Sequence, residues 1–112
     1  MAITIATIGL LQEYLDGVIK RAEHHAPNVI EIAFALIGGV IWRATGDIEV
    51  REYNGSPANI LWMPVNNKRY CFMFNHNTWV IEVREGNSRG TTLASFDNNT
   101  PLSDVTQFFR DL

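Results

Sequence analysis

The stretch that decides the fold is YCFMFNHNTWVIEVR, residues 70–84. Two runs of apolar and β-branched residues flank a polar segment, Asn75 to Thr78, and this pattern is typical of a β-hairpin. One face of the hairpin would be apolar throughout and the other face half apolar. The pattern therefore predicts a strand pair that is covered on both sides and lies at the centre of a packed sheet.

A two- or four-residue loop sets the predicted register of this hairpin. The pairs on its apolar face are Phe74 with Trp79, Phe72 with Ile81, and Tyr70 with Val83. The pairs on its other face are Met73 with Val80, and Cys71 with Glu82.

Further strands are predicted around the hairpin. Residues 40–44 and 48–52 are expected to pair across the turn Thr45-Gly46-Asp47, because a three-residue loop there places most apolar residues on one face. Residues 59–65 form the next strand, with Pro64 at its end or at an edge, and residues 91–96 form the last.

Helices are predicted at the two ends of the chain. Thr7–His25 carries apolar residues at alternating steps of three and four, and Thr100–Leu112 begins with a capping threonine and a proline at the first helical position. Residues 28–37 fit either a helix or a strand, and a helix ending at Gly38-Gly39 is preferred. The expected fold is α+β: an antiparallel sheet of about five strands packed against an N-terminal helix, or helix pair, and a C-terminal helix.

The amino-acid composition limits the functions that this chain can have. Its 112 residues, 46% hydrophobic and 19% charged, indicate one globular domain over residues 1–112. A net charge of −3 with only nine Lys and Arg argues against nucleic-acid binding, which needs clustered positive charge.

The single cysteine and the apolar segments indicate the cellular compartment of the protein. Cys71 lies mid-strand among aromatic residues, which is typical of a buried thiol in a reducing environment. The N-terminus lacks a basic region, and the apolar run 32–37 is too short to span a membrane. We expect a cytoplasmic protein that is not membrane-bound.

The histidines and the cysteine give no catalytic or metal site. His24 and His25 are adjacent on a helix and point about 100° apart, so they cannot share a metal ion. His76 belongs to a polar turn, and Cys71 has no histidine within reach on its strand. We expect no metal, no cofactor and no catalytic residue among them.

Aromatic residues and one carboxylate are the candidate binding residues. A sheet rich in Trp, Tyr, Phe and Met forms either a pocket wall or an interface. Glu82 lies on a strand that should be covered, so its carboxylate needs a partner or a wet cavity, and its pKa would otherwise be raised. The simpler interpretation pairs Glu82 with Arg84 or Arg69 at the surface. The candidate residues are Trp62, Tyr53, Glu82, Trp42 and Met73.

Three segments resemble a known class of proteins. IWRA at residues 41–44, IEVRE at 48–52 and FDNNTPL at 96–102 are similar to small orphan bacterial proteins carried on integron gene cassettes. The resemblance implies an α+β domain, often oligomeric and in some members holding a ligand-sized cleft. It implies a bacterial protein with an adaptive role and supplies no catalytic residue.

These observations favour a non-catalytic binding module over an enzyme. Its apolar, aromatic-rich cavity or surface would take a small apolar molecule or a protein partner. The alternative is a small enzyme with Glu82 as general base, assisted by Tyr53 or His76. A homodimer is also expected, because Leu10, Tyr14 and Ile19 widen the apolar stripe of the first helix beyond what one sheet face needs.

Overall fold

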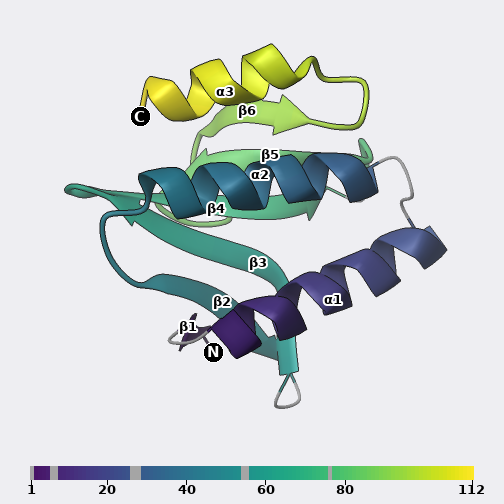
Figure 1. The fold of residues 1–112 in the computed structure, drawn as a ribbon. Helices are drawn as coiled ribbons and strands as arrows, with labels where there is room; N and C mark the ends of the chain where they lie inside the picture. The colour runs from purple at the N-terminus through teal and green to yellow at the C-terminus, as the bar shows by residue number, and fades with distance from the viewer. Residues whose placement is uncertain (1, 6–7, 26–28, 54–55, 76) are drawn as a thin grey trace.

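The fold is a single sheet with helices packed on it. The computed structural model describes the backbone of residues 2–5, 8–25, 29–53, 56–75 and 77–112, and the side chains of residues 9–20, 22–23, 29–51, 60–75 and 77–112. Six strands form an antiparallel sheet in the order β1-β2-β3-β4-β5-β6 (Figure 1). The elements are β1 (Ala2–Ile5), α1 (Ile8–His25), α2 (Ile30–Arg43), β2 (Ile48–Tyr53), β3 (Ser56–Val65), β4 (Lys68–Asn75), β5 (Val80–Glu85), β6 (Thr92–Phe96) and α3 (Leu102–Arg110). The predicted α+β class is confirmed, with β1 as an additional strand.

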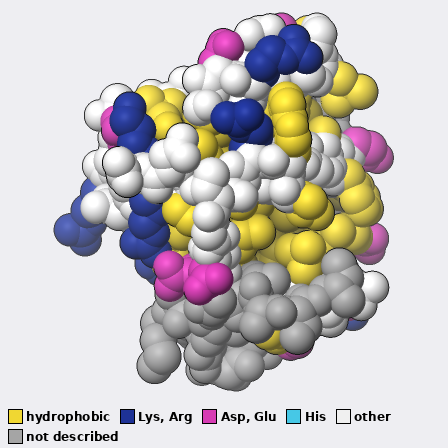
Figure 2. Space-filling model, turned by 60° about the vertical axis from the view of Figure 1, so that its left-hand side comes forward, with side chains coloured by type: hydrophobic (Ala, Val, Ile, Leu, Met, Phe, Trp, Pro, Cys, Tyr) yellow, Lys and Arg dark blue, Asp and Glu magenta, His cyan; other side chains and the backbone are white. Residues whose placement is uncertain are grey.

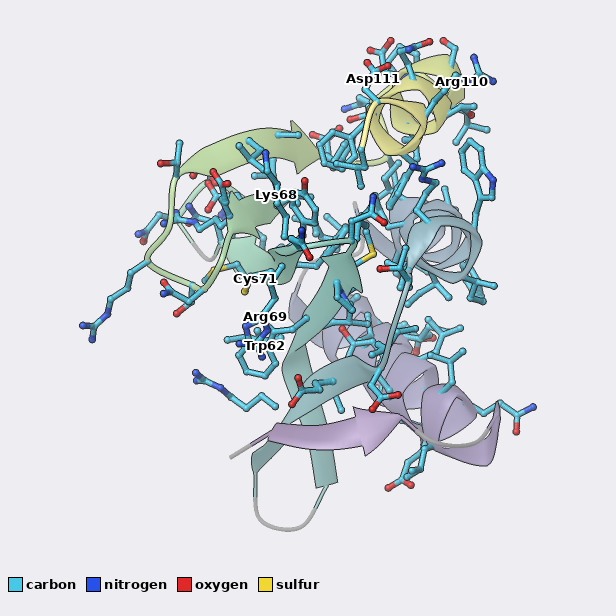
Figure 3. The ribbon with its side chains drawn as sticks, turned by 90° about the vertical axis from the view of Figure 1, so that its left-hand side faces the viewer. Trp62, Lys68, Arg69, Cys71, Arg110 and Asp111 are labelled. Carbon is cyan, nitrogen blue, oxygen red and sulfur yellow. The ribbon has the colours of Figure 1, made fainter. Side chains whose placement is uncertain are left out.

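The three helices lie on the same face of the sheet. In the edge-on view of Figure 3 they stand on one side, and Trp62, Arg69 and Cys71 lie on the other. Alternate residues of the strands fill the space beneath the helices, and Val50, Leu61 and Val83 are at most 1% exposed there. The hairpin pattern predicted cover on both sides, and the described helices cover one of them. We call the other side the open face; its side chains include Glu49, Trp62, Arg69, Cys71, Met73, Asn75, Glu82 and Arg84.

Helix α2 replaces a predicted strand. Residues 40–44 were expected to pair with 48–52, but α2 continues through Gly38 and Gly39 to Arg43. Gly39 is buried against the ring of Phe109, so the missing side chain makes room for α3 instead of ending the helix. The preference for a helix at residues 28–37 is confirmed where the structure describes them, from Val29 onward.

The N-terminal strand takes the place that residues 40–44 were expected to occupy. β1 pairs antiparallel with β2, with Ile3 opposite Val50 and Ile5 opposite Ile48. The pairing joins segments more than forty residues apart in the sequence. Local turn chemistry carries no information about such a contact.

The central hairpin forms with the predicted faces but a register shifted by two residues. Phe72 lies opposite Val83 and Met73 opposite Glu82, where Ile81 and Val80 were expected. The oxygen Oδ1 of Asn75 accepts hydrogen bonds from the backbone N–H groups of Asn77 (2.8 Å) and Thr78 (3.3 Å). Asn75 thereby fixes the turn after itself, and the strands pair two residues later than predicted.

The terminal helices match their predictions closely. α1 covers Ile8–His25 and α3 covers Leu102–Arg110. Thr100 does not cap α3: its hydroxyl accepts the backbone N–H of Asp97 at 3.0 Å, and Pro101 is the N-cap residue. The threonine therefore stabilises the loop before the helix.

Candidate functional site

The structure separates the predicted binding residues into two groups. Trp62, Met73 and Glu82 share the open face of the sheet, on three adjacent strands. Trp42 lies instead on α2, because the strand predicted for it does not form. Tyr53 ends β2, and its side chain lies outside the described residues. The candidate binding residues therefore lie on two separate surfaces, the open face of the sheet and helix α2.

Glu82 is held by an ion pair. Its Oε1 accepts bonds from Arg84 at 2.7 Å (Nη2) and 3.1 Å (Nε), and its Oε2 accepts one from Asn75 at 3.1 Å. The hydrogen bonds from Arg84 are the main reason that the pKa of Glu82 is lowered, although burial opposes the shift. A carboxylate with this environment stays charged at neutral pH. The simpler interpretation named Arg84 as one of two possible partners, but it placed the pair at the surface, whereas Glu82 is buried.

Cys71 lies beneath a layer of longer side chains. It sits between Trp62 of β3 and Arg84 of β5 in the sheet register and is 0% exposed. Burial raises the pKa of the thiol, and the charges of Arg69, Arg51 and Arg84 offset only part of that rise. The side chain therefore behaves as a small apolar residue.

A shallow groove lies over Trp62 on the open face. It has a volume of about 200 Å³ and is lined in part by Trp62, Pro64 and Arg69. The guanidinium of Arg69 stacks 4.9 Å from the centre of the indole ring and lies 3.5 Å from the carboxylate of Glu49. The indole N–H of Trp62 is buried and has no hydrogen-bond partner among the described atoms. Trp62 thus lines a groove that has an apolar floor and charged residues beside it.

The outward face of α2 is apolar and exposed. Phe34, Ile41 and Trp42 are 52%, 60% and 53% exposed, and we call these three side chains the α2 patch. The charged residues of the helix, Glu31 and Arg43, lie at its two ends, so residues 32–42 carry no charge. Figure 2 shows hydrophobic side chains gathered toward the helix side of the molecule.

Sequence reasoning found only Trp42 of this patch. Phe34 belongs to the helix predicted at residues 28–37, and Ile41 belongs to the strand predicted at residues 40–44. The signal was present, because a surface helix normally carries charge on its outer face, and the eleven residues 32–42 carry none.

The described part of the chain offers neither a metal-binding cluster nor a membrane-spanning helix. The residues described there hold no group of three or more His, Cys, Asp and Glu side chains that could bind a metal ion. The side chains of His24, His25 and His76 lie outside them. None of the described helices is long and apolar enough to cross a membrane.

Comparison with known proteins gives a family. The family model described as "Integron cassette protein VCH_CASS1 chain" matches residues 11–106, which span α1 to the middle of α3. No curated protein matches the chain. The match covers most of the chain, and its description states no activity.

Proposed function

This chain belongs to the integron cassette protein family of VCH_CASS1, and for this member we propose a non-catalytic binding function in which the α2 patch docks a second copy of the chain. The observation that carries the proposal is the exposure of Phe34, Ile41 and Trp42, each more than half exposed on a helix whose charged residues lie at its two ends. At one end the guanidinium of Arg43 lies 5.5 Å from the centre of the Trp42 ring. A bacterial cytoplasmic setting is proposed with it, because the chain has one cysteine and keeps it as a free thiol.

The size of the α2 patch suits the centre of an interface. Three large side chains, each about half exposed, present on the order of 300 Å² of apolar surface. Soluble monomers rarely leave a contiguous patch much larger than this uncovered. A standard interface buries roughly 800 Å² on each partner, so the patch would supply its apolar core and neighbouring polar residues its rim.

The arrangement of the patch favours a second copy as the occupant. Phe34 and Ile41 are equally far along α2 from the midpoint between Ile37 and Gly38. Two α2 helices crossing antiparallel at that midpoint would place Phe34 of one chain against Ile41 of the partner subunit, and the reverse. A single patch is then self-complementary, as an interface with two-fold symmetry requires.

Gly38 supports a close crossing of two helices at this midpoint. It is exposed, and a Cβ built on it meets no atom within 4 Å, so packing within one chain does not require glycine there. Glycine in a helix interior costs about 1 kcal/mol relative to alanine. In the proposed dimer, the backbone of the partner helix packs against Gly38, and this close contact explains why residue 38 is glycine.

The alternative of an enzyme with Glu82 as general base has less support. A general base works best with a pKa near the working pH, whereas the pKa of Glu82 is lowered and its oxygens are engaged by Arg84 and Asn75. We therefore favour the binding function.

Analytical ultracentrifugation at micromolar concentration tests the proposal. The native chain should sediment as a dimer, and Ile41→Glu should convert it to a folded monomer, because two carboxylates would lie buried in the interface. Leu93→Glu is the matched control: Leu93 is 43% exposed on β6, outside α2, so this variant should remain dimeric. A monomeric native chain, or equal dissociation of both variants, contradicts the proposal.

A further inference from the structure

The groove over Trp62 has a floor and two walls formed by three adjacent strands. Trp62 and Pro64 of β3 form the floor. Glu49 of β2 lies opposite Trp62, and Arg69 of β4 lies opposite Pro64. The walls are thus built from neighbouring strands that the sheet holds at a fixed separation.

Acidic and basic residues lie on opposite walls of the groove. The acidic residues Asp47 and Glu49 stand on the β2 side, and the basic residues Lys68 and Arg69 stand on the β4 side. The lining therefore has two negative and two positive side chains and no net charge. A ligand that matches it carries one charge of each sign, separated by a short apolar body that rests on Trp62 and Pro64.

Two polar interactions in the groove are weak or missing in the free protein. The Arg69–Glu49 ion pair spans 3.5 Å, which is long for a charge-assisted hydrogen bond, and both side chains are well exposed, so it holds the groove only weakly. Arg69 overlies the ring of Trp62, whose buried indole N–H has no hydrogen-bond partner in the described part of the chain. A buried donor without an acceptor destabilises the folded protein, and a ligand oxygen can relieve that destabilisation.

We infer that this groove binds a small zwitterion of the amino-acid type. Its ammonium group binds Glu49 and Asp47, and its carboxylate binds Arg69. As the guanidinium of Arg69 turns toward the carboxylate, the indole N–H of Trp62 becomes accessible and donates to the same carboxylate. The groove, with a volume of about 200 Å³, has room for a molecule of this size. This site is independent of the α2 patch, which lies on the helix side of the sheet.

Titration of the native chain with β-alanine tests the inference. The indole N–H resonance of Trp62, identified by its loss in Trp62→Phe, should shift as β-alanine is added, with a dissociation constant on the order of 1 mM. Propionate and propylammonium carry one charge each on a body of similar size, and they should produce at most a tenth of that affinity. Equal binding of propionate contradicts the inference, because the site would then recognise only an anion.

Variants locate the binding to the groove. Glu49→Gln removes the ammonium partner from an exposed position and should weaken β-alanine binding about tenfold without unfolding the chain. Glu85→Gln is the control, since Glu85 is exposed on β5 and does not line the groove. The inference is overturned if β-alanine causes no shift, or if both variants bind it like the native chain.

Discussion

The aromatic ring of Phe109 lies against the backbone of Gly39, in the space that a Cβ at residue 39 would occupy. α2 and α3 run side by side in the same direction there, as Figure 1 shows. The ring is 1% exposed, stacks on Phe72 with 6.0 Å between centroids, and meets Phe108 edge-on at 5.4 Å. It therefore has no space into which it can withdraw.

Gly39→Ala should destabilise the protein. A methyl group at residue 39 overlaps the ring of Phe109, and forcing extra volume into a packed core costs about 1–3 kcal/mol. This cost exceeds the gain of roughly 1 kcal/mol that alanine brings to a helix interior. Urea denaturation followed by circular dichroism measures the change, and an unchanged or raised midpoint would contradict this account of the α2–α3 contact.

Gly38→Ala is the matched control for Gly39→Ala. The two glycines are adjacent on α2, but a Cβ at Gly38 meets no atom within 4 Å. Measured in the Ile41→Glu background, which removes the proposed dimer contact, Gly38→Ala should leave stability unchanged or raise it by up to about 1 kcal/mol. Equal destabilisation by both substitutions would contradict the account in which contact with Phe109 is responsible.

Asn98 caps α2 from a distant part of the chain, and Asn98→Ala should cost about 1 kcal/mol. Its Oδ1 accepts the backbone N–H of Ile32 at 2.9 Å, and its Nδ2 donates to Glu31 at 2.7 Å. The N-cap residue of the helix, Val29, offers no side-chain cap. Asn99→Ala serves as the comparison in thermal unfolding, because the hydrogen bond at Asn99 comes from its backbone N–H to Asp97. A larger loss in Asn99→Ala would disprove the capping role.

Glu82 should make stability depend on pH in the acidic range. The pKa of the folded carboxyl is lowered from its ordinary value of 4.5, so the unfolded chain binds the proton more readily. The contribution of Glu82 to the free energy of unfolding is therefore fully present above pH 4.5. It is lost as the pH falls through the lower pKa that Glu82 has in the folded protein. Glu82→Gln should cost about 2 kcal/mol at neutral pH, because Arg84 loses a charged partner.

The pH profile of urea midpoints separates this effect from simple loss of packing. The difference between the native chain and Glu82→Gln should shrink as the pH is lowered below 4.5. Glu85→Gln, at an exposed position on the same strand, should change the midpoint little at any pH. A difference at Glu82 that stays constant across the acidic range would rule out the ion pair as its source.

The sequence by itself determined the elements whose signal is local. The helical periodicity of residues 8–25 and the alternation in β4 and β5 are complete within single segments, and both elements form as predicted. The sequence also named Arg84 as one of two possible partners of Glu82, and Trp62 as a residue of a pocket wall or an interface. These features depend on residues that are close in the sequence, either along one strand or across a hairpin, so the spacing of residues is enough to indicate them.

Only the tertiary structure decided the extent of α2, the partner of β2 and the separation of Trp42 from Trp62. The segment 40–43 fits a strand as well as a helix by its residues, and the contact between Gly39 and Phe109 makes it a helix. Once that segment is helical, β2 pairs with β1, and Trp42 moves from the sheet to the outer face of α2. The reason is that an apolar segment buries similar surface in either conformation, so contacts distant in sequence select between them.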